Sequence, residues 1–433
     1  MKYYSTNNKN LIVNFETAVM QGLSEDGGLF MPAEFPQMEK DFIDSLEKYS
    51  FQEIAFRIAK KFIEDEIPES SLHDIISNSI TFPAPLVSIG KNLYVLELFH
   101  GPTLAFKDFG ARFMAKTMGY FVAKRNTNLN ILVATSGDTG SAVAHGFYDT
   151  PGINVFILYP KGKVSLIQEK QLTTLDKNIT ALEIDGTFDD CQRLVKTAFV
   201  DKELNKKLNL TSANSINIAR LLPQAFYYFE AYKQILDKKI RSIFSVPSGN
   251  LGNLTAGLIA KKIGLPISKF IGAVNSNSVF AEFLRTGIFN PRPSIQTLSN
   301  AMDVGNPSNL IRIREIYSNI LKDMQNDIHS ESYDDIQTRK GIKEVYEKYK
   351  YIIDPHGSVG YLALRDYINF LQQFNGVILE TAHPAKFKEV IEEELKIEVE
   401  IPERLAVCLK KEKRTVELSS QYEDLKEYLM KLG

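Results

Sequence analysis

Lys107 is the residue whose surroundings in the sequence most clearly suggest chemistry. It lies in ELFHGPTLAFKDFGARFMAK (97–116), between Phe106 and Phe109 and shortly after a Gly-Pro turn. Lysine is rarely buried without a partner, and an amine among apolar groups loses its proton more easily because burial disfavours charge. Such an amine can attack a carbonyl group. The simpler interpretation is a surface lysine that pairs with Asp108.

Two further stretches have the composition of anion-binding loops. The segment TSGDTGSAVAHGF (135–147) follows the apolar run NILVA, and SGNLGNLTAG (248–257) follows SIFSVP. Free backbone N–H groups at the start of a helix bind anions in such places. Taken alone, the first stretch is equally consistent with an ordinary capped helix, and the second with a tight strand-to-helix turn. The presence of both favours anion binding.

Two shorter segments add candidate side chains. Asn214 and Arg220 of TSANSINIAR could hold a second anion, since arginine can grip phosphate or carboxylate with two parallel hydrogen bonds. For this segment taken alone, a surface helix start is favoured. Thr381 begins TAHPAKF, directly after the apolar run GVILE, where a hydroxyl could meet a ligand. His383 could be a base, but no partner residue is in view and a structural role is favoured.

A lysine among aromatic residues and two phosphate-type loops together suggest pyridoxal phosphate. Its 5'-phosphate requires a glycine-rich anion site, and its aldehyde requires a lysine as Schiff-base partner. No loop has the GxGxxG pattern of dinucleotide-binding proteins or the GK[ST] ending of a P-loop. A nicotinamide oxidoreductase and a nucleoside triphosphatase are therefore not favoured.

The composition sets broader limits. The net charge of -2 over 433 residues provides no general attraction for nucleic acid or an anionic membrane. The two cysteines form no CxxC pair and the six histidines form no HxH or HExxH, so we expect neither a disulfide scaffold nor a metal site. The sequence shows no signal-peptide core and no long apolar run. We expect a cytoplasmic protein that binds neither nucleic acid nor membrane.

The elements that must position these residues follow an α/β pattern. Apolar residues at helical spacing predict a mostly helical region over 1–90. Short apolar runs then alternate with helical segments, which predicts mainly parallel sheets with helices on both faces. The predicted strands are NLYVLELF, NILVAT, NVFILYP, SIFSVP, FIGAV and GVILE, and the predicted helices are 139–148, 188–199, 217–235 and 251–263. Ligands bind such sheets at the carboxyl ends of the strands.

The same pattern suggests a division into domains. A smaller α/β domain within 91–215, at about 110–215, would carry TSGDTG, and a large domain would span 216–433 and share 91–109. The polar, helical segment 306–350 is predicted to be an insertion. The C-terminal tail combines a charge run with an amphipathic helix, and we expect it to form a solvated face.

The chain resembles the long form of the threonine synthase family, which has the fold-type II architecture of pyridoxal phosphate enzymes, similar to the tryptophan synthase β chain. The similarity runs from VMQGLSEDGGLFMP to TAHPAKF, most of the chain. Between them the matching motifs are HGPTLAFKDFGARFMA, ATSGDTGSAVAHGF, ILYPKGKVS, SANSINIAR, SVPSGNLGNLTAG and LSNAMDVGNPSN. The lysine motif and the SGNxGN loop are the specific ones. The resemblance implies two open twisted sheets and an added N-terminal helical region.

The resemblance also implies a role for each matching residue. Lys107 would carry pyridoxal 5'-phosphate, and Thr381 would meet its pyridine nitrogen. The cofactor phosphate would be held by Ser248, Gly249, Asn250, Leu251, Gly252 and Asn253. The substrate, O-phospho-L-homoserine, would be held by Thr135, Ser136, Asp138, Thr139, Asn214 and Arg220. The implied reaction eliminates phosphate from Cγ and adds water at Cβ, which gives L-threonine and phosphate.

Some alternatives stay open on the sequence alone. A phospho-lyase that converts the same substrate to 2-oxobutyrate would share nearly every motif, whereas a threonine or serine dehydratase would leave Asn214 and Arg220 without a use. A catalytically inactive, metabolite-binding relative would not need Lys107. The phosphate loop reads SGNLGN where relatives often have SGNFGD, so Leu251 and Asn253 depart from the family pattern. The long form of the family leads us to expect a monomer, with a dimer as the alternative.

Overall fold

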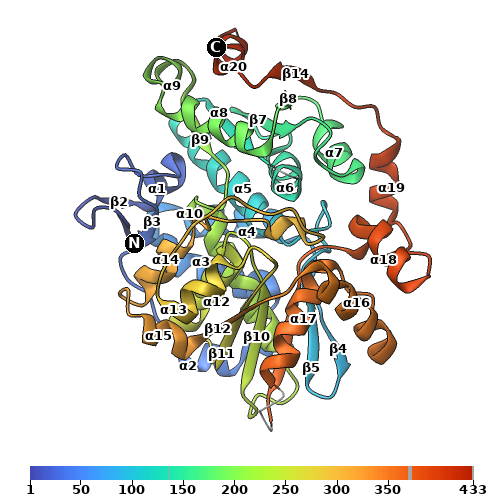
Figure 1. Ribbon diagram of the computed structural model, residues 1–433. Helices are drawn as coiled ribbons and strands as arrows, with labels where there is room; N and C mark the ends of the chain where they lie inside the picture. The colour runs from blue at the N-terminus through green and yellow to red at the C-terminus, as the bar shows by residue number, and fades with distance from the viewer. Residues whose placement is uncertain (136, 369–372, 432–433) are drawn as a thin grey trace.

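Three sheets organise the part of the chain that the computed structural model describes, residues 1–135, 137–368 and 373–431 (Figure 1). The strand orders are β12-β11-β10-β13-β5-β4, β14-β8-β7-β6-β9 and β2-β1-β3. The two larger sheets are parallel except for the β4–β5 pair. They lie at opposite ends of the molecule in Figure 1. The predicted α/β class with mainly parallel sheets is confirmed.

The six-stranded sheet forms the larger layer. Its strands are β4 (Leu86–Gly90), β5 (Leu93–Glu97), β10 (Ser242–Pro247), β11 (Lys269–Val274), β12 (Ile328–Ser332) and β13 (Asn375–Glu380). Every residue of β10 and β13 is buried, as expected for central parallel strands with helices on both faces. The helices that follow in this part of the chain are α12 (Gly252–Lys262), α13 (Val279–Thr286), α14 (Leu310–Ile316), α15 (Leu321–Asp327), α16 (Asp335–Tyr349), α17 (Pro355–Ile368), α18 (Lys388–Leu395) and α19 (Glu403–Lys410).

The five-stranded sheet carries helices on both faces. Its strands are β6 (Leu129–Ala134), β7 (Ile153–Pro160), β8 (Ile179–Asp185), β9 (Leu210–Ser212) and β14 (Val416–Ser419). Its helices are α5 (Lys107–Arg125), α6 (Asp138–Phe147), α7 (Leu166–Thr173), α8 (Phe188–Val200), α9 (Lys202–Leu208) and α20 (Tyr422–Met430). Alternate residues of β6 enter different cores: Ile131 packs with α5 and α6, and Leu132 packs with α8 and α20.

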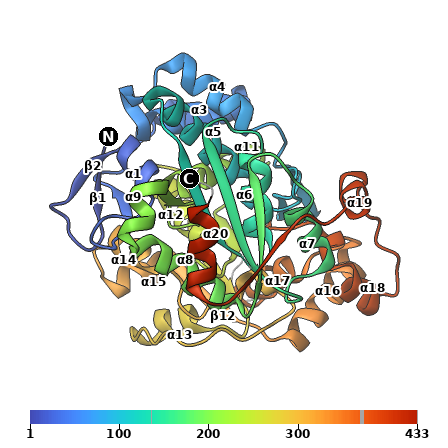
Figure 2. The same ribbon diagram turned by 90° about the horizontal axis from the view of Figure 1, so that it is seen from above.

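The N-terminal region combines helices with a small sheet. Its strands are β1 (Lys2–Ser5), β2 (Ile12–Asn14) and β3 (Phe30–Pro32), and its helices are α1 (Phe15–Gln21), α2 (Lys40–Asp44), α3 (Phe51–Ile63) and α4 (Glu69–Ser79). Figure 2 shows α3 and α4 together at one edge of the molecule, beside α5. The expectation of a mostly helical region missed the antiparallel sheet, because strands of three or four residues are too short to show an alternating pattern.

All six strands predicted from apolar runs are confirmed, and three of the four predicted helices match α6, α8 and α12. The fourth, predicted over 217–235, is interrupted. It consists of α10 (Ile218–Leu221), a 3-10 turn over 222–225 and α11 (Phe226–Gln234). The turn contains Pro223, which has no N–H to donate to a helical hydrogen bond.

Two edge strands differ from the sequence-based expectation. β12 lies inside the segment 306–350 that was expected to be a helical insertion, and it pairs with β11. β14 lies in the C-terminal tail, within the range 216–433 assigned to the large domain, yet it pairs with β8 of the smaller sheet. In Figure 1 the chain passes α18 and α19 before it reaches β14 and α20. No helix in the described ranges is both long enough and apolar enough to cross a membrane.

Candidate active site

A cavity of about 470 Å³ lies where loops from the two larger sheets meet. Thr135, Asp138 and Thr139 follow β6, residues 249–253 follow β10, and Thr381 follows β13. Further lining comes from segments 212–216 and 300–308. The site is therefore at the carboxyl ends of parallel strands, as expected for open α/β sheets.

Lys107 reaches this cavity from the first position of α5. The preceding loop is tied to the end of β13, because the Phe106 N–H donates to the Thr381 carbonyl at 2.9 Å. Leu104 in this loop has a φ of 58°, an uncommon left-handed conformation that is found often at functional sites. Burial lowers the pKa of the Lys107 ammonium to about 8, against the opposing effect of Asp138. Lys386 and Arg220 lower that pKa further.

The expectation that Phe106 and Phe109 both flank the amine is wrong for Phe109. The Lys107 Nζ lies 5.9 Å from the centre of the Phe106 ring. The Phe109 ring instead packs 4.7 Å from the ring of Phe82 and also contacts Phe51 and Tyr227. Residues two positions apart on a helix do not share a face, so Phe109 is directed into the core. The desolvation of Lys107 therefore comes from the cavity walls.

The loop after β10 is built to leave backbone N–H groups available. The Asn253 side chain accepts from the Ser248 hydroxyl at 2.6 Å and donates to the Pro247 carbonyl at 2.8 Å, which closes the loop. Leu251, the residue before α12, has a φ of 60°. Within the described ranges, the N–H groups of Gly249, Asn250 and Leu251 donate to no other protein group. Together with the start of α12 they form an anion-binding loop.

Neighbouring segments hold this loop in place. The Asn250 side-chain amide donates to the Ser215 hydroxyl at 2.5 Å, and the backbone carbonyl of Asn250 accepts from the Asn309 side chain at 3.0 Å. A Cβ built on Gly249 would lie 2.7 Å from the Cα of Met302, so only glycine fits at that contact. The loop is thus fixed between the segments that contain Ser215 and Met302.

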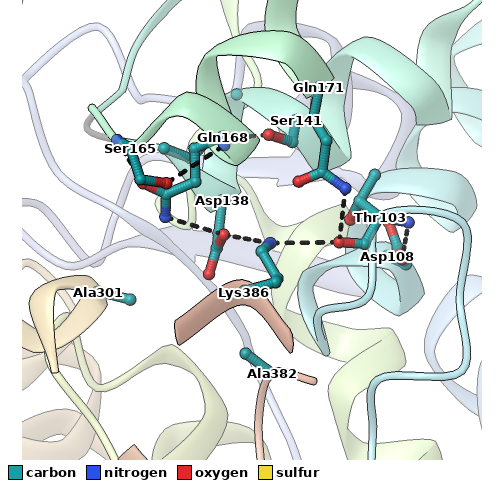
Figure 3. Close-up of polar contacts among 12 residues, drawn as sticks. Thr103, Asp108, Asp138, Ser141, Ser165, Gln168, Gln171, Ala301, Ala382 and Lys386 are labelled. Carbon is teal, nitrogen blue, oxygen red and sulfur yellow. Dashed lines mark hydrogen bonds and ion pairs between the residues drawn. The ribbon is translucent and has the colours of Figure 1, made fainter. Parts of the chain in front are cut away.

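The substrate-binding candidates near β6 include side chains that already make hydrogen bonds within the protein and one that does not. Thr135 accepts hydrogen bonds from the N–H groups of Gly137 and Gly140 at 3.0 and 2.9 Å, so its hydroxyl shapes the loop itself. Thr139 lines the cavity and makes no hydrogen bond through its hydroxyl within the described ranges. Asp138 is held by Lys386 and Gln168 (Figure 3). Ser136 lies outside the described residues.

Arg220 and Asn214 face the same cavity. Arg220 is only 3% exposed, and its Nη1 donates to the Ala213 carbonyl at 2.8 Å. Its Nε is buried without a partner in the described structure. Burial lowers the pKa of the guanidinium to about 10, which leaves it charged at neutral pH. A buried charge with a free N–H group is suited to an anionic ligand.

Thr381 lies at the end of β13 and lines the cavity, and its hydroxyl makes no hydrogen bond in the described part of the chain. His383, two residues further, does not line the cavity. Its Nδ1 accepts from the Ala385 N–H at 3.1 Å, and burial lowers the pKa of its imidazole to about 4. His383 therefore caps the turn over 384–387, in agreement with the favoured structural role.

Several residues at the site had no role in the sequence-based prediction. His356 lines the cavity, and its Nδ1 lies 2.7 Å from Asp354. Lys386 contacts Asp138, and Arg312 donates to carbonyls near Ser215. Lys386 belongs to the quoted motif TAHPAKF, but its motif offers no signal that it pairs with a residue 248 positions away.

The residues present fit pyridoxal phosphate. A desolvated lysine, a loop with free N–H groups and a neutral hydroxyl at a strand end all open onto one cavity. No three His, Cys, Asp or Glu side chains gather as metal ligands would in the described ranges.

Comparison with known proteins agrees with this assignment. The family model "Pyridoxal-phosphate dependent enzyme" matches residues 75–376. The chain is therefore a pyridoxal-phosphate-dependent enzyme with the fold-type II architecture. Two further models, "Threonine synthase N terminus" and "Threonine synthase, C-terminal", match residues 2–80 and 358–429.

Individual relatives narrow the assignment. Threonine synthase of Haemophilus influenzae is 44% identical over 432 residues, which cover 100% of both chains. The crystal structure of threonine synthase from Escherichia coli matches with a TM-score of 0.93 and 44% identity, over 100% of both chains. The structure of PLP-bound threonine synthase from Brucella melitensis matches with a TM-score of 0.94 and 34% identity, over 99% of this chain and 98% of that one. This chain belongs to the threonine synthase family.

Proposed function

We propose that this enzyme converts O-phospho-L-homoserine and water to L-threonine and phosphate. The observation that carries the proposal is the arrangement of Lys107 and Arg220 on one cavity. Lys107 has a pKa lowered to about 8, and Arg220 has a buried Nε without a partner in the described structure. The first suits covalent attachment of an aldehyde cofactor and proton transfer, and the second suits a phosphate group on the substrate.

The loop after β10 is proposed to hold the cofactor. The free N–H groups of Gly249, Asn250 and Leu251, with those at the start of α12, would bind its 5'-phosphate, and Ser248 and Asn253 would keep the loop closed. Thr381 would face the pyridine nitrogen with a neutral hydroxyl. When bound, pyridoxal phosphate withdraws electrons from the bonds at the substrate's Cα and Cβ.

Lys107 is proposed to move the proton at Cα of the substrate. A pKa of about 8 leaves a useful neutral fraction at neutral pH, and a proton acceptor is most effective when its pKa lies near the working pH. A second proton leaves Cβ, the bond between Cγ and the phosphate oxygen breaks, and phosphate leaves with the electron pair. A proton then adds at Cγ, which becomes the methyl group of threonine. The oxygen of water bonds to Cβ to give the threonine hydroxyl, and a proton returns to Cα.

Substrate binding is proposed for the anion-binding side chains around Lys107. Arg220, Asn214 and Thr139 would hold the substrate phosphate, because each lines the cavity with a donor that is not used elsewhere in the described structure. Thr135 and Asp138 would act on the substrate through the shape of their loop, since their side chains are engaged within the protein. Ser136, whose structure is not described, stays a candidate from the sequence.

We also propose that the enzyme acts in the cytoplasm as a monomer on this small-molecule substrate, without nucleic acid or membrane partners. The net charge of -2 supports the absence of nucleic-acid and membrane partners, because it provides no general attraction for either.

The test is a visible spectrum of the purified protein, before and after addition of O-phospho-L-homoserine, with analysis of the products. The proposal expects a cofactor band that changes with substrate, and release of threonine and phosphate in equal amounts. In Lys107→Ala, both the cofactor band and the formation of products should be lost. Formation of 2-oxobutyrate instead of threonine would make the enzyme a phospho-lyase. Absence of a cofactor band after addition of pyridoxal phosphate would indicate a catalytically inactive relative.

A further inference from the structure

A buried ion pair lies beside the active-site lysine. The Lys386 ammonium contacts the Asp138 carboxylate, and their side chains are 0% and 3% exposed (Figure 3). Lys386 also donates to the Thr103 carbonyl at 3.2 Å. The Gln168 side chain donates to the same oxygen of Asp138 at 3.2 Å. Each charged group therefore has two protein partners, and those of Asp138 share its Oδ1.

The pair joins segments that come from different sheets. Asp138 is the first residue of α6, which covers the five-stranded sheet, and Lys386 lies in the 3-10 turn after β13 of the six-stranded sheet. Thr103, whose carbonyl Lys386 contacts, also donates to Asp108 through its N–H at 2.8 Å and its hydroxyl at 2.7 Å. Asp108 follows Lys107 in the first turn of α5, so the network extends to the helix that carries the reactive amine.

A contribution to stability alone is a weak explanation for such a pair. Removing two charges from water is costly, and a buried ion pair is often replaced by apolar residues of similar size without loss of stability. A single unpaired charge at the same place would be much less favourable. Asp138 lines the same cavity as Lys107, and both charges of the pair influence the pKa of the Lys107 amine.

We propose that Lys386 is a positioning residue of the active site, which holds Asp138 at the start of α6 beside Lys107 and balances its negative charge. This inference rests on the proposed function, in which Lys107 must give up and take back a proton. Without Lys386, a bare carboxylate would face the amine and stabilise its charged form. Without Asp138, the amine would face the Lys386 ammonium with no intervening negative charge.

The charges that face the Lys107 amine come from several elements. Asp138 on α6 raises the pKa of Lys107, whereas Lys386 and Arg220 lower it. Asp108 lies next to it on α5, and its carboxyl is held by Thr103. His356 on α17 faces Asp138 and lowers the pKa of that carboxyl. Opposite effects of Asp138 and Lys386 make the proposal testable by charge removal.

The experiment is a pH titration of the visible absorbance of the holoenzyme, which reports the proton on the nitrogen that Lys107 contributes to the bound cofactor. The variants are Lys386→Met, Asp138→Asn and the double variant. The expected midpoint shifts are about one pH unit upward in Lys386→Met and about one unit downward in Asp138→Asn. The double variant should titrate close to the wild type, because it removes both charges.

Lys388→Met is the matched control. Lys388 lies two positions from Lys386 but donates to the Val399 carbonyl and pairs with Glu392 away from the cavity. Its loss should leave the midpoint unchanged. Midpoints that move in the same direction in both single variants, or that do not move, would overturn the proposal. If Lys386→Met fails to fold, Asp138→Asn and the double variant still test the proposal. The midpoint of Asp138→Asn must then lie below that of the double variant.

The titration requires bound cofactor but no substrate, so its outcome is separate from that of the product analysis. A product other than threonine together with the expected shifts would overturn the proposed reaction and support the role of Lys386. Threonine formation without the shifts would overturn the role of Lys386 and support the proposed reaction.

Discussion

The Asn253 side chain donates a hydrogen bond to the carbonyl of Pro247 at 2.8 Å and thereby closes the loop between β10 and α12. The same side chain accepts from the Ser248 hydroxyl and from the Leu254 N–H. Asn253 is 4% exposed, so these partners have no ready replacement in water. The residue that departs from the family pattern at this position is therefore an internal brace of the anion-binding loop.

Asn253→Ala should weaken cofactor binding. It removes three hydrogen bonds and leaves buried partners unsatisfied, at a cost of about 1–3 kcal/mol in unfolding free energy and roughly tenfold in cofactor affinity. Asn253→Asp is the matched variant, because it keeps both acceptor bonds and loses only the donor to Pro247. Urea unfolding and equilibrium titration with pyridoxal phosphate measure both effects. Equal behaviour of the two variants would contradict this role.

Capture of pyridoxal phosphate by the cofactor-free enzyme should depend on pH through Lys107. The neutral amine is the reactive form, and a pKa of about 8 leaves roughly a tenth of it neutral at pH 7, whereas an ordinary lysine is only about 0.04% neutral. The rate should therefore rise with pH up to about 8 and then level off. Stopped-flow absorbance measures it, and a rate that continues to rise toward pH 10 would show an ordinary lysine.

Arg312 should be required for the geometry of the substrate-binding segment. It is fully buried, and it donates to the carbonyls of Phe30 at 2.9 Å and Ile216 at 2.6 Å and to the Asn309 side chain at 2.8 Å. Burial lowers the pKa of its guanidinium to about 9. Arg312→Met should lower the unfolding free energy by about 2–4 kcal/mol and raise KM for the phosphorylated substrate.

The control for Arg312 lies on the same helix. Arg314 donates at the surface to Asn319, so Arg314→Met should change the unfolding free energy by less than about 0.5 kcal/mol. Chemical denaturation and steady-state kinetics distinguish the two variants. A loss of stability in Arg312→Met with KM unchanged would mean that Arg312 supports the fold without influencing the substrate-binding segment.

Glu380 should tolerate replacement by its neutral isostere. It is fully buried, one carboxyl oxygen accepts from the Asp354 N–H at 2.6 Å, and the other has no partner in the described structure. Burial and the nearby Asp354 raise the pKa of this carboxyl well above its usual range. Above the ordinary glutamate pKa the unfolded chain ionises while the folded state stays neutral, so the wild type loses stability as pH rises.

Glu380→Gln removes that penalty. Its unfolding free energy relative to the wild type should increase from about pH 4 to about pH 7. Asp354→Asn is the contrasting change, because both Asp354 oxygens accept hydrogen bonds, from His356 and from the Ala382 N–H. It should lose about 2–3 kcal/mol. Denaturation series at several pH values test both predictions. If the stability of Glu380→Gln relative to the wild type falls as pH rises, the Glu380 carboxyl is ionised in the folded wild type and the prediction is wrong.

The residues proposed to bind the cofactor lie in short sequence patterns that can be recognised without the structure. Lys107 follows a turn and begins a helix, and the glycines and asparagines of 248–253 follow an apolar run that ends in Pro247. Each pattern depends on neighbours along the chain, and the carboxyl ends of parallel strands bring such loops to one edge. The cofactor class, the central strands and the anion-binding loop could therefore be predicted without coordinates.

Contacts between distant segments could not be predicted in this way. The edge strands β12 and β14 are polar and short, so their pairing with β11 and β8 leaves no apolar pattern in the sequence. The Phe109 side chain points into the core because it lies two positions after Lys107 on α5, on a different face of the helix. Lys386 meets Asp138, and His356 accepts from the Ala301 N–H at 3.2 Å, only because the chain returns to the cavity from the second sheet. Residue types decide which groups can react, and the packing of the sheets decides which charges surround them.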